Sequence, residues 1–238
     1  MKKLSQTELD DILNAHEQWW DSRNEAHRAI WQNATDEQKN QTNTDWAEKK
    51  LKEYKLRGTQ IQILRDLDLR GLSFAGRNLS QLKFENLDLS GANLRETWFA
   101  RAEMKRINFH KADLCESSFE NGVLENINFA EAMMQDTQID GLIASKNLIF
   151  DNAQMSRAFF VKSGISDSSF KNAVLCEASF RRAHLKNCSM ENADLREADF
   201  TYVYLIDVNI RGANTEGADF SDAKELPEEW KNKIKGSV

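Results

Sequence analysis

Large apolar residues recur at every fifth position over more than half of this chain. The first run extends from Leu69 to Ile139, and the second from Phe150 to Phe220 with Thr215 as its one exception. A second row of mostly small residues lies two positions before the large ones, as in Ala92 and Leu94. A spacing of five fits neither the 3.6-residue period of a helix nor the two-residue period of a flat strand. The chain must therefore change direction within each unit of five residues.

A four-sided coil satisfies this spacing. Each side would use five residues, with the small and large ones pointing inward, so that about twenty residues complete a turn and turns stack about 4.8 Å apart. Grouping the units by four from Leu69 gathers phenylalanine on two opposite sides and Leu, Met and Ile on the other two, as a closely packed interior requires. The grouping continues past the break only if residues 140–149 hold one irregular unit and one extra residue. We therefore expect a bulged side there, not a domain boundary.

Four units of the chain read Ala92-Asn93-Leu94, Ala112-Asp113-Leu114, Ala193-Asp194-Leu195 and Ala218-Asp219-Phe220. These triplets resemble the Ala-Asp/Asn-Leu/Phe-x-x pattern of the pentapeptide-repeat family. The resemblance implies an all-β solenoid, the right-handed quadrilateral β-helix of that family. Leu or Ile replaces the small residue in several units, such as Leu67 and Leu87, and we therefore expect the first turns to be wider or partly covered.

The ends of such a coil are open strand edges that must be covered. We assign residues 66–223 to the β-helix, residues 1–65 to a helical N-terminal extension or cap, and residues 224–238 to a short C-terminal helix and tail. Ser5 and Glu8 form a capping box before the first helix, and a second helix is predicted from Asp45 to Leu56. The alternative role for these helices is a docking arm for a partner. The predicted apolar face of the first helix contains Leu9, Ile12, Leu13, His16, Trp19 and Trp20.

The net charge and the length of the apolar runs limit which partners and which location we expect. The net charge of −6 argues against direct nucleic-acid binding. No apolar run approaches the roughly 18 residues of a membrane span, and no signal-peptide pattern follows the first residues. Three cysteines without paired spacing fit a reducing cytosol. We expect a cytoplasmic protein without membrane contact, although secretion without a signal peptide stays open.

Residue types that carry chemistry are scattered. His110 and His184 would point outward on different sides of the coil. Cys115 and Cys176 would share one side but lie three turns, about 14 Å, apart, too far for a disulfide or a shared zinc ion, and Cys188 takes an inward small position. We expect no enzymatic activity, no metal and no cofactor.

One outward column is acidic. Like charges stacked about 4.8 Å apart repel one another, which favours a ligand-binding surface. We nevertheless favour the simpler interpretation, in which repeat duplication copied Glu and basic neighbours such as Arg95, Arg101, Lys162 and Arg196 neutralise it. The column, interrupted by Arg157, contains Glu96, Glu116, Asp136, Glu177 and Glu197.

A second outward cluster lies near the C-terminal end. Tyr202, Tyr204 and Ile206 form an apolar and aromatic group, and such groups commonly mark interfaces. We interpret it as a homodimer contact. Alternatively, Leu226 and Trp230 cover it within one chain.

The family resemblance implies two kinds of function. Some members are similar to B-DNA in width and charge, bind bacterial type II topoisomerases and protect them from toxins or quinolones; many others act as scaffolds or secreted effectors. Residues 66–223 contain 24 Asp and Glu against 17 Lys and Arg, a net −7, and this mixed charge weakens DNA mimicry. We predict a protein-interaction scaffold. The first alternative is a DNA mimic that binds DNA gyrase or topoisomerase IV, and the second is a secreted effector.

Overall fold

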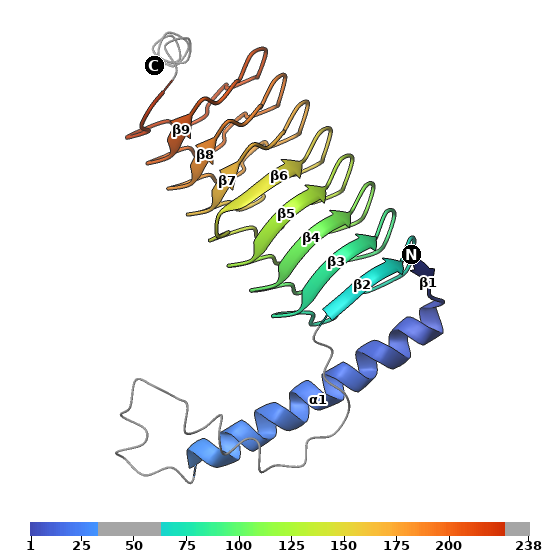
Figure 1. Cartoon of the computed structure of the whole chain (residues 1–238). Coiled ribbons are helices and arrows are strands. Elements are labelled where there is room, and N and C mark those ends of the chain that lie inside the picture. Colours follow the sequence, from blue (N-terminus) through green and yellow to red (C-terminus); the bar gives the residue numbers. More distant parts are fainter. Residues whose placement is uncertain (33–62, 227–238) are drawn as a thin grey trace. The chain divides into compact units, whose positions relative to one another are not determined.

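The computed structural model describes residues 1–32 and 63–226 of the chain. The chain divides into two compact units, one of Met1–Leu4 with Ile63–Val238 and the other of Ser5–Gln62. In the described residues the strands form one nine-stranded sheet in chain order, and every pair is parallel (Figure 1). The elements are β1 (Lys2–Lys3), α1 (Gln6–Gln32), β2 (Ile63–Asp68), β3 (Lys83–Asp88), β4 (Glu103–Asn108), β5 (Val123–Asn128), β6 (Ser145–Ile149), β7 (Gly164–Ser166), β8 (His184–Lys186) and β9 (Tyr204–Ile206).

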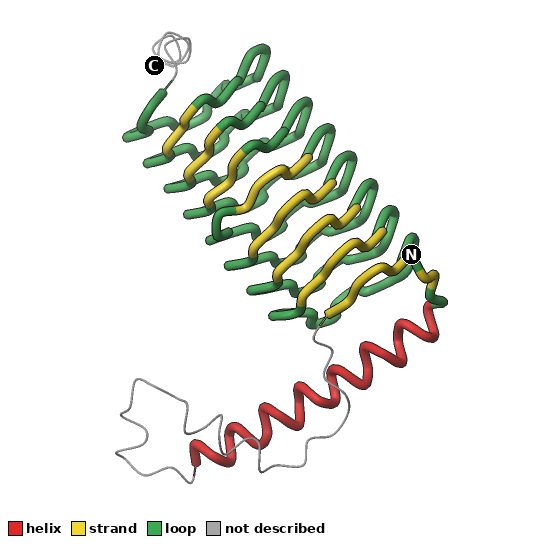
Figure 2. The backbone as a smooth tube through the Cα atoms, viewed as in Figure 1, coloured by secondary structure: helices red, strands yellow, loops and turns green. Residues whose placement is uncertain are grey.

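Strands β2 to β9 are the same side of successive turns of a coil. Lys83 pairs with Glu103 and Glu103 with Val123, a register of twenty residues per turn. Single parallel bridges link the other sides, most of them in the same register, as between Asn78 and Trp98. Figure 2 shows the successive turns of the coil stacked on one another. The predicted four-sided all-β solenoid is therefore confirmed.

Two columns of stacked phenylalanines fill the interior. Phe160, Phe180 and Phe200 stack face to face with ring centroids 4.6 and 4.8 Å apart. The second column, which includes Phe150 and Phe170 at 4.7 Å, meets the first edge-on. These rings are fully buried. The predicted alternation of aromatic and aliphatic sides is confirmed, and it leaves a closely packed interior.

The corners of the coil place one residue per unit in the left-handed backbone region. This residue lies two positions after the large inward residue, and its φ is 56° at Glu96, 59° at Arg101 and 61° at Glu116. For residues other than glycine this conformation costs about 1–2 kcal/mol. Its backbone N–H is nevertheless paired, since Glu116 N donates to Gln135 O of the next turn at 2.9 Å. Each corner therefore constrains which residues the sequence can place there.

The register changes once, at the segment where the sequence period breaks. It rises to 21 between β5 and β6, where Glu125 pairs with Lys146, and returns to 20 between β6 and β7. Ala144, with φ 48°, lies in the left-handed region outside the five-residue series. The sheet continues through this irregular side.

Three buried serines accept backbone hydrogen bonds around the irregular side. Ser145 Oγ accepts from Leu124 N at 3.0 Å. In the same way Ser163 Oγ accepts from Leu142 N and Ser168 Oγ from Leu148 N, both at 3.0 Å. Because a buried N–H without a partner is costly, these hydroxyls stabilise the altered backbone.

The strands become shorter along the coil. Strands β2 to β6 have five or six residues, whereas β7 to β9 have three. The long strands reach Leu67, Leu87 and Ile127, whereas Ser168 and Cys188 occupy the equivalent position in the later turns. Val208 occupies the same position after β9, so side-chain size alone does not set the strand length. The predicted widening or covering of the first turns stays a prediction.

The N-terminal residues divide between the two units. Within residues 63–226 the coil is already formed at Ile63, three residues before the expected boundary, and Lys2–Lys3 join it as β1 by pairing with Leu67 and Asp68. The prediction of a helical extension or cap over residues 1–65 does not include this pairing, because a two-residue strand has no periodic pattern in the sequence.

Helix α1 begins with the predicted capping box. Ser5 N donates to Glu8 Oε2 at 2.8 Å, and Glu8 N donates to Ser5 Oγ at 3.2 Å. Leu9, Leu13 and His16 of the predicted apolar face are buried. The predicted helix at Asp45–Leu56 and the C-terminal helix after Leu226 lie outside the described residues.

Candidate interaction surface

The predicted acidic column lies along one corner of the coil. Its residues share the left-handed conformation, from φ 56° at Glu96 to φ 61° at Glu116. Gly76 and Gly217 take the same corner in the turns before and after the column. The side chains point outward, and all but half-buried Asp136 are exposed. We call Glu96, Glu116, Asp136, Glu177 and Glu197 the acidic corner.

Two of these carboxylates are paired with arginine. Arg95 Nη2 lies 2.8 Å from Glu116 Oε1. Arg157 donates to both oxygens of Asp136, at 2.8 and 2.7 Å, and this hydrogen bonding lowers the pKa of the Asp136 carboxyl. The acidic corner is thus partly neutralised by neighbouring turns.

Three carboxylates of the acidic corner lack a direct ion pair within the described part of the chain. Among the described residues, Glu96, Glu177 and Glu197 form no ion pair. Arg196, one of the expected neutralising neighbours, pairs instead with Asp194 at 2.7 Å and lowers its pKa to about 2. The carboxylates without an ion pair are therefore Glu96, near the start of the acidic corner, and Glu177 and Glu197, near its end.

The predicted C-terminal cluster is exposed. Tyr202, Tyr204 and Ile206 are 44%, 41% and 41% accessible, and Arg182 lies over the Tyr202 ring at 5.7 Å. Leu226 is half-buried, and Trp230 lies outside the described residues. The cluster is less distinctive than the sequence suggested, because other turns also expose large apolar residues, including Trp98, Met133, Ile143 and Phe159.

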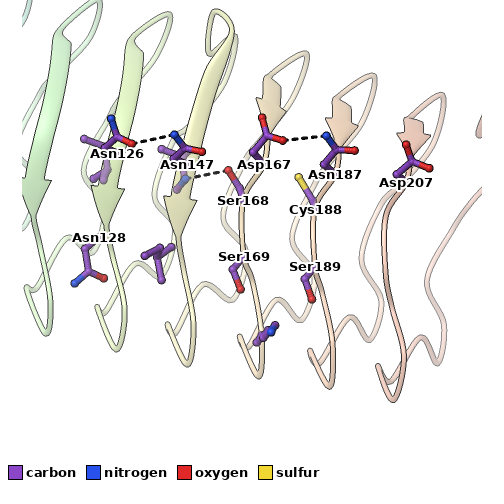
Figure 3. A pocket seen from close by; sticks show the side chains of 14 residues that line it. Asn126, Asn128, Asn147, Asp167, Ser168, Ser169, Asn187, Cys188, Ser189 and Asp207 are labelled. Carbon is purple, nitrogen blue, oxygen red and sulfur yellow. Dashed lines mark hydrogen bonds between the residues drawn. The ribbon is translucent and has the colours of Figure 1, made fainter.

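A shallow groove of about 850 Å³ lies across strands β5 to β9 (Figure 3). Asn147 Nδ2 donates to Asn126 Oδ1 and Asn187 Nδ2 to Asp167 Oδ1, each at 2.9 Å. Ser189 Oγ is buried here without a hydrogen-bond partner among the described residues. No sequence motif predicted this groove; counting by twenty, with one extra residue between β5 and β6, would have shown its Asn and Asp column, namely Asn126, Asn147, Asp167, Asn187 and Asp207.

The described residues offer little catalytic chemistry. In residues 1–32 and 63–226, no three His, Cys, Asp or Glu side chains come together in a way that could hold a metal ion. The three cysteines are free thiols, and burial raises the pKa of Cys188 to about 11, which keeps it protonated. No helix in the same ranges is long and apolar enough to cross a bilayer.

A filled coil of twenty-residue turns with outward side chains in columns defines a β-solenoid repeat protein. The family model for pentapeptide repeats matches eight copies over residues 63–106, 107–141 and 165–201. The chain belongs to the pentapeptide-repeat family.

Solved structures of other pentapeptide-repeat proteins are similar to this chain. HetL from the cyanobacterium Nostoc sp. strain PCC 7120, involved in heterocyst differentiation regulation, is 20% identical; the match covers 68% of this chain and 86% of HetL, with a TM-score of 0.43. A trypsin-treated QnrB1, a plasmid-mediated fluoroquinolone resistance protein, is 19% identical over 73% of this chain and 86% of its own, with a TM-score of 0.47. None of the curated proteins compared with the chain matches it.

Proposed function

We propose that this protein is a non-catalytic scaffold that binds other proteins through the outer faces of its coil. The packed interior supports this proposal most directly, since stacked rings such as Phe160 and Phe180 at 4.6 Å leave no room for a ligand inside the coil. Ligand contacts must then be made by outward side chains, which the coil holds in columns about 4.8 Å apart. The three free thiols fit a reducing compartment, so we propose a cytoplasmic location.

Affinity capture with the full chain as bait tests the scaffold proposal. The expected result is a small set of proteins retained by the intact chain and lost from variants altered on one face. The matched control reverses two charges on another face, as in Lys171→Glu with Arg211→Glu. Two outcomes contradict the proposal. Either every face variant retains the same proteins as the intact chain, or the intact chain retains no protein above the level of an unrelated bait.

A second candidate function is DNA-mimic binding to a type II topoisomerase. The acidic corner supports it, because Glu96, Glu177 and Glu197 form no ion pair among the described residues. The arginine pairs at Glu116 and Asp136 weaken the resemblance to a continuous phosphate backbone.

A supercoiling assay with purified DNA gyrase tests this candidate. The intact chain should alter supercoiling or quinolone sensitivity, and Glu177→Lys with Glu197→Lys should abolish the effect at an unchanged melting temperature. An effect that the double variant retains, with its salt dependence intact, would show that these carboxylates make no contact.

A further inference from the structure

Five outward positions stack on one side of the coil, along strands β5, β7, β8 and β9 and the segment before β6. Backbone hydrogen bonds place them in order. Ile143 N donates to Gly122 O at 3.0 Å, Gly164 N to Leu142 O at 2.9 Å, and His184 N to Ser163 O at 2.9 Å. With turns about 4.8 Å apart, the five positions extend over about 19 Å. We call these positions, Val123, Ile143, Gly164, His184 and Tyr204, the apolar stripe.

The apolar stripe is open to solvent. Ile143 is 59% accessible, and Val123, His184 and Tyr204 are also exposed. The imidazole of His184 stacks on the Tyr204 ring, with centroids 4.5 Å apart and planes within 5°. The stripe therefore presents an aliphatic end and an aromatic end on one face.

Gly164 leaves a gap between these two ends. Its φ lies outside the left-handed region, and a Cβ added there would meet no atom closer than 3.6 Å. Neither backbone conformation nor packing requires glycine at this position. A planar group placed over Gly164 would continue the stack about one turn spacing, 4.8 Å, from His184.

Lysine and arginine side chains flank the apolar stripe on both sides. Lys162 and Arg182 lie at the preceding corner, whereas Lys146 and Lys186 follow the stripe positions on the same side of the coil. Lys146 lies 3.7 Å from Glu125 Oε1. Among the described residues, the other three form no ion pair with a carboxylate. We call Lys146, Lys162, Arg182 and Lys186 the cationic rim; it is unusual in a chain of net charge −6.

We propose that the apolar stripe and the cationic rim bind an acidic peptide segment with an aromatic anchor. The anchor fills the gap over Gly164 and stacks on His184. Carboxylates on either side of the anchor pair with Lys162, Arg182 and Lys186. The strand edges on this side are paired with neighbouring turns, so recognition rests on side chains and not on strand addition. The partner's chemistry is opposite to that expected at the acidic corner, which would take a cationic partner.

A library of short random peptides displayed on phage and selected on the full chain tests this proposal. We expect enriched peptides with several Asp or Glu residues around a Trp, Tyr or Phe. Binding of the synthetic peptides should fall about tenfold or more with Gly164→Val, which fills the gap, and with Lys162→Glu combined with Lys186→Glu. Gly164→Val should preserve the melting temperature, because an added Cβ meets only ordinary contacts and the position faces outward.

The matched control is Lys171→Glu with Arg211→Glu, which makes the same change in net charge on the adjacent side. It should bind the peptides like the parent chain. Enrichment of neutral or cationic peptides, no enrichment at all, or equal binding by the stripe and control variants overturns the proposal. A second copy seated over Gly164 and His184 would also prevent enrichment, and that outcome overturns the proposal, whereas a dimer formed through Tyr202 and Ile206 alone leaves the gap over Gly164 open. The scaffold proposal is tested separately. If protein partners are captured through another face, the scaffold proposal holds even when no peptide binds the apolar stripe.

Discussion

At the scale of single residues, the left-handed corners limit what the sequence can present to a partner. Straight-chain residues, Asn, Asp and Gly occupy most of these positions, as in Arg101, Lys162 and Asn187, with Tyr202 as an aromatic exception, and no Val, Ile or Thr has a positive φ in the described residues. Branching at Cβ makes this conformation strongly unfavourable. The frequency of Glu at the acidic corner is therefore partly a backbone effect.

Substitutions at Arg101 test this constraint. Arg101 has φ 59°, so Arg101→Val should lower the free energy of unfolding by about 1–2 kcal/mol. Arg101→Gly should be close to neutral, because relief of the left-handed strain is offset by about 0.5–1 kcal/mol of added chain entropy. Urea denaturation of both variants measures the difference, and equal effects would contradict it.

The alternation of inward and outward residues has a sharper test. Phe119 is buried and stacks on Phe99 at 5.0 Å. Phe119→Asp places a carboxylate among aromatic rings without a partner and should prevent folding or cost several kcal/mol, about 3 or more. Ser118→Asp, one residue earlier and outward, should change the melting temperature little. Similar losses by circular dichroism at both positions would overturn the register.

At the scale of single elements, the irregular side differs from the other turns in a buried serine. Ser145 takes the position where other units hold a large inward residue. Its hydroxyl is buried and pairs with the backbone instead. The extra residue is tolerated because that pairing replaces part of the backbone ladder.

Ser145→Ala should therefore cost about 1–3 kcal/mol, since it leaves the Leu124 N–H buried without an acceptor. Ser156→Ala, at an outward half-buried position, should cost less than about 0.5 kcal/mol. Equilibrium denaturation compares the two variants. A small effect at Ser145 would mean that water or a backbone shift satisfies the amide.

Strand β1 covers part of the first edge of the coil. Leu4 N donates to Asp68 O at 3.4 Å, and the Leu4 side chain is buried. Removal of Met1–Leu4 should lower the melting temperature slightly and promote self-association through the exposed edge of β2. Light scattering checks this, with Lys2→Ser as the control that keeps the backbone pairing. A monodisperse shortened chain would show that β1 does not protect the edge.

At the scale of the whole molecule, the faces of one coil differ in the partners they suit. The acidic corner suits a cation, the rim around the apolar stripe suits an anion, and Tyr202, Tyr204 and Ile206 suit an apolar contact. One rigid backbone holds all three at fixed positions, which fits a scaffold better than a uniform DNA mimic.

The predicted homodimer is a property at this scale. Sedimentation of the full chain should give a dimer, and Tyr202→Ser with Ile206→Ser should shift it toward the monomer. A chain ending at Ala223 tests the alternative in which the C-terminal residues cover the cluster within one chain. A monomeric full chain at tens of micromolar would rule out the dimer, and a shortened chain that aggregates would favour the cover.

The sequence by itself determined the coil, its four sides, its aromatic columns and the position of the extra residue. It could do so because a five-residue period repeated over many turns leaves one way to bury Phe119, Phe180 and their equivalents. It also determined which outward residues share a column, because the register follows from counting by twenty.

Only the tertiary structure decided what those columns do. The pairing of Asp136 with Arg157, the gap at Gly164 and the hydroxyl of Ser145 on Leu124 N all depend on contacts between residues about one turn apart. The joining of Lys2–Lys3 to the coil depends on a contact across more than sixty residues. The repeat pattern determines the backbone position from which each outward side chain projects. The rotamers, ion pairs and exposure of these side chains depend on neighbours in adjacent turns, and a local sequence pattern does not encode those contacts.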